Sequence, residues 1–145
     1  MTTLILDFES YYDSEYSLKK MTTPAYILDP RWETIMVAAK VDNGEHQIID
    51  GLDFPQWLAQ FDPARTTTVT FNSLFDSSVL AWRYGFVPSL MIDAMGLARA
   101  LLGHELARFS LKSVAEHLEL GAKGDALANM MGKRREQIKA EGLWD

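Results

Sequence analysis

The 145-residue sequence predicts an α/β protein built on a mixed sheet of five strands that is flanked by helices. Three strand-like runs come first, and the second and third are joined by Asn43-Gly44, which is typical of a tight hairpin. Strand-like and helix-like segments then alternate, as they do where helices connect parallel strands. We therefore expect three antiparallel strands followed by parallel ones, with the first strand in the centre. The first three runs span 4–10, 33–41 and 45–49.

Each later element has a local signal of its own. Segment 65–71 is rich in threonine and valine, which favour strands, and 87–92 is predicted as a fifth short strand. A pair of prolines limits 23–30 to a short helix or turn. Aspartates that can cap a helix, and glycines that end one, bound several of the other predicted helices. Those helices span 53–61, 73–84, 94–102, 110–120 and 125–140.

Composition limits the class of protein. With 48% hydrophobic residues the chain can form a core, and we expect residues 1–145 to make one domain. The absence of cysteine excludes disulfides and thiolate metal sites and favours a reducing, cytoplasmic location. No apolar run reaches the ~20 residues of a membrane span, and Met1-Thr2-Thr3 lacks the basic region of a signal peptide. We expect no membrane partner.

The net charge of −6 argues against a protein that coats DNA with basic residues. An acidic protein can still act on nucleic acid if some of its carboxylates hold metal ions. Tyrosines and lysines interleave in segment 11–21, which suits base stacking and phosphate contact, and Lys20 is the residue we predict to bind nucleic acid there. A plain surface loop is the alternative for this segment.

Two carboxylates lie inside the first strand. Because strand side chains alternate, Asp7 and Glu9 share one face and Phe8 points to the other. Their Cα atoms would lie roughly 6.5–7 Å apart, and like charges on an apolar strand favour a hard divalent cation between them. The alternative is a strand that ends near Asp7, with both acids solvated.

A third carboxylate follows the fourth predicted strand. Asp76 lies in the first turn of the helix at 73–84, and Asn72 lies at the strand–helix junction. If the fourth strand is next to the first, Asp76 can face Asp7 and Glu9, because ligands of α/β sheets bind at such junctions. The alternative is an acid that only interacts with the helix dipole.

The pattern D-x-E, followed about seventy residues later by N-x-x-x-D, resembles the proofreading 3′–5′ exonucleases of the DEDD superfamily. The similarity is greatest to the exonuclease domains of phage and bacterial family A DNA polymerases. Further stretches match in the same order along nearly the whole chain, at 12–21, 26–31, 81–85, 93–101 and 120–124.

This resemblance implies a ribonuclease H-like fold and hydrolysis with two divalent cations, Mg²⁺ or Mn²⁺. It implies that Asp7 binds both metals, that Glu9 binds one and orients the attacking water, and that Asp76 holds the second. The implied partners are the 3′ end of single-stranded DNA and a polymerase domain or other replication protein. The residues expected to contact nucleic acid are Phe8, Lys20, Asn72, Phe75, Lys133, Arg134 and Arg135; a solvated basic face is the alternative for the last three.

The sequence departs from the family in one respect that bears on catalysis. A fourth aspartate is expected on a late helix, four residues after a tyrosine or five after a histidine, and no such pair occurs in the last forty residues. Asp125 and Asp145 are the nearest acids, but their neighbours do not fit, and Asp93 is expected to cap a helix. Thr70-Phe71-Asn72 also stands where Ala-His-Asn is usual.

We therefore expect a chain shortened before its last motif, whether as a fragment or naturally, and weak or absent hydrolysis. The alternative function is a catalytically weak ribonuclease H-like module that binds nucleic acid or a partner protein. A third possibility is a nuclease of the same superfamily that acts on RNA.

Overall fold

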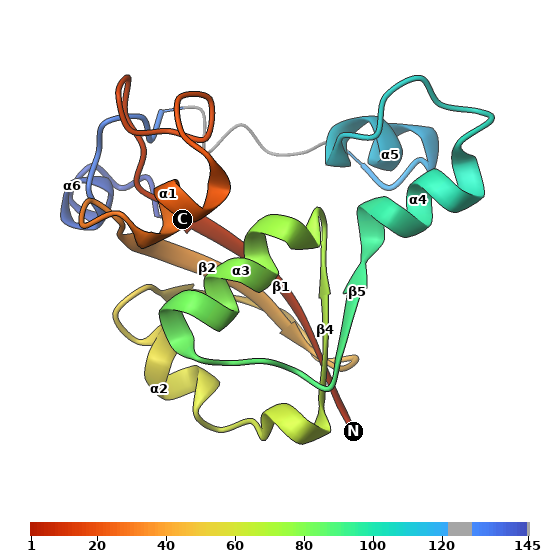
Figure 1. Ribbon diagram of the computed structural model, residues 1–145, viewed down its shortest axis with the longest axis horizontal. Helices are drawn as coiled ribbons and strands as arrows, with labels where there is room; N and C mark the ends of the chain where they lie inside the picture. The colour runs from red at the N-terminus through yellow and green to blue at the C-terminus, as the bar shows by residue number, and fades with distance from the viewer. Residues whose placement is uncertain (122–128, 145) are drawn as a thin grey trace.

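The computed structural model describes residues 1–121 and 129–144, and its centre is one mixed sheet (Figure 1). The strands are β1 (Thr2–Ser10), β2 (Thr34–Val41), β3 (His46–Asp50), β4 (Thr66–Thr70) and β5 (Leu90–Asp93). They lie in the order β3-β2-β1-β4-β5, which confirms that the first strand is central. Antiparallel pairs join β1 to β2 and β2 to β3, whereas β4 is parallel to both β1 and β5.

The alternation of side chains along β1 decides which face is buried. Leu4, Leu6 and Phe8 are at most 5% exposed, whereas Ile5 is 43% exposed and Asp7 is also exposed. The buried set packs against helices on one side of the sheet. Asp7 is therefore on the opposite face from Phe8, as the period of two predicts.

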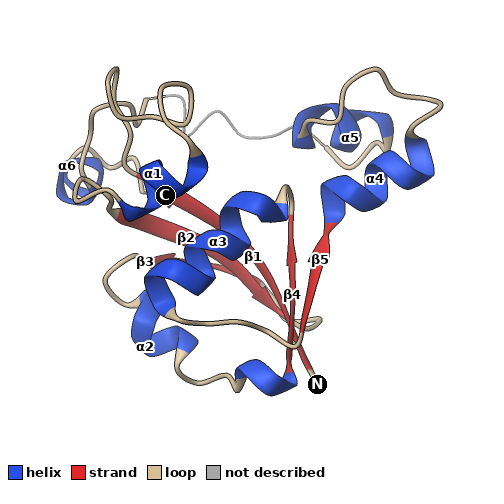
Figure 2. Cartoon of the chain, in the orientation of Figure 1, coloured by secondary structure: helices blue, strands red, loops and turns tan. Residues whose placement is uncertain are grey.

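Helices cover the Phe8 side of the sheet (Figure 2). The core there joins Phe8 of β1 to Phe54 of one helix and to Val79 and Leu80 of another, all at most 5% exposed. In chain order the described helices are α1 (Thr23–Leu28), α2 (Phe54–Leu58), a 3-10 turn (Pro63–Arg65), α3 (Ser73–Tyr84), α4 (Ala94–Leu102), α5 (Leu111–His117) and α6 (Arg135–Ala140).

The bounds of α3 and α4 agree with the predicted ones. Gly85 ends α3 in a left-handed conformation, with φ of 63°, and its amide donates to the carbonyl of Ala81. Asp93 caps α4 by accepting a hydrogen bond from the amide of Met95, as predicted. Asp53, which the sequence predicted as the cap of a helix at 53–61, precedes α2, but its side chain makes no capping hydrogen bond and the helix ends at Leu58.

Other bounds differ from the prediction. The fifth strand begins at Leu90 instead of residue 87, and α5 is shorter at both ends than 110–120. The predicted helix 125–140 begins only at Arg135; its residues 125–128 lie outside the described chain. Residues 129–134 are not helical, because Gly132 has φ of 73°, which a right-handed helix does not permit.

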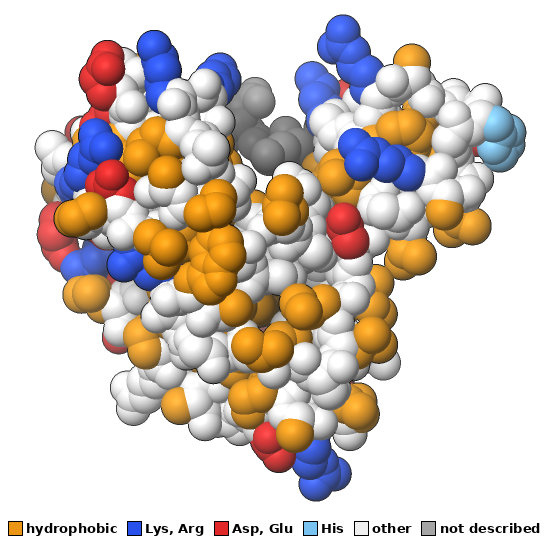
Figure 3. Space-filling view, in the orientation of Figure 1, with side chains coloured by type: hydrophobic (Ala, Val, Ile, Leu, Met, Phe, Trp, Pro, Cys, Tyr) orange, Lys and Arg blue, Asp and Glu red, His pale blue; other side chains and the backbone are white. Residues whose placement is uncertain are grey.

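In the described ranges, no helix has the length and apolar character that crossing a bilayer requires. Helices α4 and α5 lie together beside β5, while α1 and α6 lie near each other at the far side (Figure 1). The space-filling view shows apolar side chains gathered over α1 and α3 on the face toward the viewer (Figure 3).

Candidate active site

The sheet register brings the first turn of α3 to the centre of β1. Strand β4 pairs with β1 only over residues 2–5, and Ile5 lies opposite Val69. Beyond that point β1 continues without a strand on this side, and α3 begins beside it. The amide of Phe8 would lose its ladder partner there, and it donates to Oδ1 of Asp76 at 3.2 Å instead.

Asp76 is buried, with 4% of its surface exposed. Burial, together with the smaller effect of the charges of Asp7 and Glu9, raises the pKa of its carboxyl to about 7, against the opposing hydrogen bond from the Phe8 amide. Since these two acids affect its titration, the three carboxylates lie within electrostatic reach of one another. That Asp76 faces Asp7 and Glu9 closely enough to share a metal ion with them stays a prediction.

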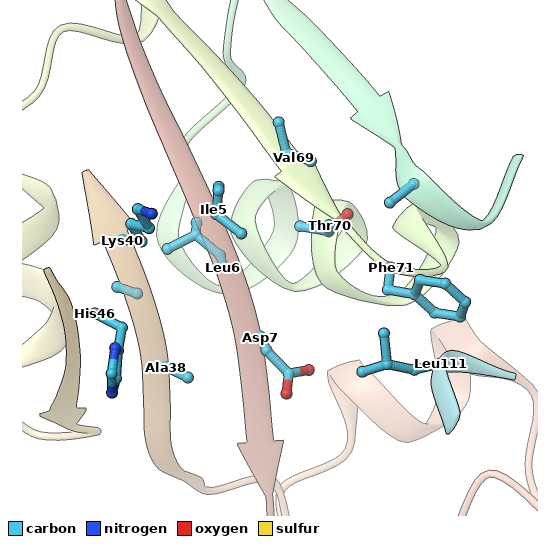
Figure 4. Close-up of a pocket in the computed structure, with 12 residues that line it drawn as sticks. Ile5, Leu6, Asp7, Ala38, Lys40, His46, Val69, Thr70, Phe71 and Leu111 are labelled. Carbon is cyan, nitrogen blue, oxygen red and sulfur yellow. The ribbon is translucent and has the colours of Figure 1, made fainter. Parts of the chain in front are cut away.

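Asp7 and Glu9 open onto two different pockets. Asp7 lies opposite Ala38 of β2 and lines a pocket of about 370 Å³ on the uncovered face of the sheet. Its side chain leaves β1 toward Phe71 and Leu111, which supply the far wall (Figure 4). Lys40 and His46 also line this pocket, and most of its other lining side chains are apolar.

Glu9 lines a second pocket, of about 410 Å³, which we call the loop pocket. It lies between the end of β1, the loop that follows it, and the start of α3. Its wall combines the carboxylate of Glu9 with aromatic, basic and thioether side chains. They include Tyr12, Lys19, Lys20, Phe75 and Met131.

Oxygen donors of these three acids are the type that Mg²⁺ and Mn²⁺ prefer. Within residues 1–121 and 129–144, however, no group of three or more histidine, aspartate or glutamate side chains is arranged to hold a metal ion. Asp76 directs one oxygen to the Phe8 amide. The carboxylate oxygens are suitable ligands for a divalent cation, but the described residues do not bring three such side chains together. Asp125 and Asp145, the two late acids, lie outside the described residues.

Asn72 holds the junction between β4 and α3 in a left-handed conformation, with φ of 68° and ψ of 65°. The backbone amide of Asn72 donates to Oδ1 of Asp93 at 2.9 Å. Asp93 therefore links the starts of α3 and α4 as well as capping α4, a connection that the sequence did not indicate. Asn72 itself is exposed beside the candidate site.

The residues predicted to contact nucleic acid divide into two groups. Phe8, Lys20 and Phe75 line the loop pocket. Phe8 places its ring in the core, 5.2 Å from the ring centre of Phe54 and 6.0 Å from that of Tyr84. The structure thus gives the Phe8 side chain a packing role; its contact with nucleic acid stays a prediction.

The basic residues near α6 have protein partners. Arg135 is 9% exposed, and its guanidinium donates to both oxygens of Asp50 at 3.1 and 2.9 Å. The Arg134 guanidinium lies 3.6 Å from the centre of the Tyr11 ring, and Lys133 pairs with Glu141. The contacts of Arg134 and Arg135 attach α6 to the rest of the protein, whereas the sequence predicted nucleic-acid binding or a solvated basic face for these residues.

Asp50 is the acid that anchors α6, and sequence reasoning missed it. Burial raises its pKa, but the hydrogen bond from Lys139, the Leu52 amide and the charge of Arg135 outweigh burial and lower the pKa below its ordinary value. The carboxylate is thus ionised and paired over the whole neutral range.

No protein-family model matches this chain, and no curated protein matches it. Several solved structures do match. An RNase D from Trypanosoma brucei in complex with RNA U12 has a TM-score of 0.63 at 15% identity, over 99% of this chain and 46% of that one.

Brucella melitensis NrnC bound to pGG has a TM-score of 0.59 at 19% identity, over 84% of this chain and 54% of that one. NrnC of the same organism with bound Mg²⁺ has a TM-score of 0.58 at 15% identity, over 97% and 75%. This chain thus spans about half the length of the first two. At identities this low, the structural similarity establishes the fold alone: the chain has the ribonuclease H-like α/β fold of these nucleases.

Proposed function

We propose that this chain is the nuclease module of a metal-dependent 3′–5′ exonuclease that removes nucleotides from single-stranded nucleic acid. The observation that carries this proposal is the burial of Asp76 against the Phe8 amide, within electrostatic reach of Asp7 and Glu9. The charges of Asp7 and Glu9 raise the pKa of the buried Asp76, and a cation bound among the three acids would relieve this repulsion. A role in binding that cation explains why they lie together.

Asp7, Glu9 and Asp76 are the residues that would hold Mg²⁺ or Mn²⁺. The cations supply an activated water and stabilise the leaving oxygen. The Phe8 amide fixes the orientation of Asp76, while the open pockets beside Asp7 and Glu9 leave room for a substrate strand. NrnC with bound Mg²⁺ is consistent with this use of metal.

The substrate class that we propose is a single strand with a free 3′ end. The sequence resemblance favours DNA, presented by a polymerase domain or another replication protein. The structural neighbours include an RNase D in complex with RNA and NrnC bound to pGG, which favours RNA. An assay on DNA and RNA oligonucleotides of the same base sequence decides between the two substrates.

The test is a time course on 5′-labelled DNA and RNA oligonucleotides with Mg²⁺, with Mn²⁺ and with a chelator. We expect metal-dependent shortening from the 3′ end that Asp7→Ala abolishes and that exposed-surface Asp53→Ala leaves intact. We expect it to be slow, because the described acids do not form an assembled metal site; loss of one catalytic group costs a factor of ~100 or more. A 3′-phosphorylated oligonucleotide controls for endonucleolytic cleavage.

A second function, a ribonuclease H-like module that binds nucleic acid without cleaving it, is favoured by that same lack of an assembled site among residues 1–121 and 129–144. It predicts retention of the oligonucleotide with no shortening in either metal. A chain that neither binds nor shortens any of the oligonucleotides contradicts both functions.

A further inference from the structure

The loop pocket is closed on one side by a segment far away in the sequence. Met131 lines it together with residues of β1, of the loop after β1 and of α3. In Figure 1 the red loop after β1 and the blue segment that leads into α6 lie near each other, and the amide of Gly132 donates to the carbonyl of Tyr12 at 2.7 Å. The pocket is thus assembled from both ends of the described chain.

The loop side of the pocket is held by Asp13. Its Oδ1 accepts from the amides of Glu15 and Tyr16 at 2.9 and 2.7 Å, and its Oδ2 accepts from the Tyr11 hydroxyl at 2.6 Å. The Tyr16 side chain is completely buried. The loop therefore presents its lysines and Tyr12 from a fixed backbone.

The opposite side is held on both flanks of Met131. Met130 is 3% exposed and packs with Ile35, Met36 and Ile138. After Met131 come the Gly132 hydrogen bond to the loop and Arg134, which donates to the carbonyl of Arg31 at 2.8 Å. Between two fastened neighbours, Met131 is 55% exposed.

An exposed methionine fixed at a pocket with a carboxylate, two lysines and aromatic rings is a contact surface for a flat, polarisable group. Thioethers pack favourably on π systems, and lysines beside them suit a phosphate. We propose that Met131 contacts a nucleobase of the bound strand, opposite the wall that contains Phe75. Lys19 and Lys20 then face the backbone phosphate of the same nucleotide.

This inference rests on the proposed function in taking single-stranded nucleic acid as the ligand. It goes further by making the segment before α6 part of the substrate site and by assigning Met131 as a positioning residue. The fastening of α6 through Arg135 and Asp50 then has a functional consequence, because it holds Met131 at the pocket.

The test uses the full chain labelled with ¹³C at its seven methionine methyl groups, assigned by single Met→Leu variants. Dithymidine monophosphate and its uridine counterpart are titrated with and without Mg²⁺. We expect the Met131 methyl signal to move upfield, because a base ring lies against it. The Met91 signal, from an exposed residue of β5 that lines another pocket, is expected to stay in place.

A second measurement compares affinities for the same dinucleotides. Met131→Ala should weaken binding about fivefold or more, on the scale of one lost base contact, whereas Met131→Leu should keep most of it and Met91→Ala all of it. Since Met131 is exposed, none of these changes should alter the melting temperature by more than a degree or two. That result separates a contact with the ligand from a role in folding.

A Met131 signal that stays in place at millimolar dinucleotide overturns the inference, whatever the chain does to longer strands. Equal affinity of Met131→Ala and the parent also overturns it. If Met131 responds and no oligonucleotide is shortened, the base contact holds and the exonuclease proposal fails. If strands are shortened and Met131 does not respond, the exonuclease proposal holds and this inference fails.

Discussion

The carboxylate of Asp76 accepts a hydrogen bond from the backbone amide of Phe8 at 3.2 Å, which joins the first turn of α3 to the central strand. This hydrogen bond lies beyond the end of the pairing between β1 and β4, which covers residues 2–5 of β1. It also fixes an acidic group beside Asp7 and Glu9. One interaction thus serves the sheet and arranges the candidate site.

The stability of the chain should depend on the protonation of Asp76. Its pKa in the folded protein is about 7, against an ordinary value of 3.8. Between these two pH values the folded state keeps a proton that the unfolded state has released. The free energy of unfolding contributed by this group is therefore highest below pH 4 and falls as the pH rises to about 7.

Asp76→Asn should accordingly raise the free energy of unfolding at pH 8, and by less at pH 5. Asparagine keeps an oxygen for the Phe8 amide and carries no charge. Urea unfolding at both pH values measures the change. The control is Asp53→Asn at an exposed residue without a capping hydrogen bond, which should behave alike at the two pH values. A less stable Asp76→Asn at pH 8 would mean that the ionised carboxylate is structurally required.

Manganese should stabilise the folded chain. A cation that binds only the folded state adds about 2.7 kcal/mol when its concentration is 100 times the dissociation constant. The melting temperature at pH 7.5 should therefore rise with Mn²⁺, and Asp7→Ala or Glu9→Ala should reduce the rise, while Asp53→Ala leaves it unchanged. An equal rise in Asp7→Ala would place the cation elsewhere.

Arg135→Ala should destabilise the protein by about 2–4 kcal/mol, because it leaves the largely buried Asp50 with Lys139 as its remaining basic partner. Lys133→Ala removes an ion pair to Glu141, whose side chain is 49% exposed, and should cost about 1 kcal/mol or less. Chemical unfolding of both variants measures the difference. Equal losses would contradict the anchoring role of Arg135.

The sequence predicted the sheet because its signals are local. The Asn43-Gly44 turn, the alternation in β1 and Gly85 after α3 each depend on a few neighbouring residues, and all agree with the structure. The helix before Arg135 was overestimated, because the polar and basic residues around Gly132 suggested a continuous helix. Gly132 is left-handed there, and its amide donates to the carbonyl of Tyr12, far away in the sequence.

The candidate site was predictable in part for the same reason. Asp7 and Glu9 stand out as charges in an apolar strand, and Asp76 as an acid at a strand–helix junction. The pairing of Asp50 with Arg135 and the place of Met131 at the loop pocket depend on tertiary contacts between distant segments. No short-range pattern marks such residues: the sequence predicted that Arg135 binds nucleic acid or lies on a solvated basic face, and it predicted no partner for Asp50.

Two substitutions of Asn72 distinguish the role of its backbone from the role of its side chain. With φ of 68° its backbone is left-handed, which glycine adopts freely and alanine only at a cost of about 1 kcal/mol. Asn72→Gly should therefore keep the stability of the parent, while Asn72→Ala should lose about 1 kcal/mol. Both variants lack the side-chain amide of Asn72, which the sequence resemblance implies contacts nucleic acid.

Both variants should consequently bind a single-stranded oligonucleotide more weakly than the parent, and by a similar factor, despite their different stabilities. Fluorescence anisotropy of a 5′-labelled strand, measured well below both melting temperatures, tests this. If Asn72→Gly binds as tightly as the parent, the side chain does not contact the strand. The role of Asn72 is then limited to its left-handed backbone and to the hydrogen bond from its backbone amide to Asp93.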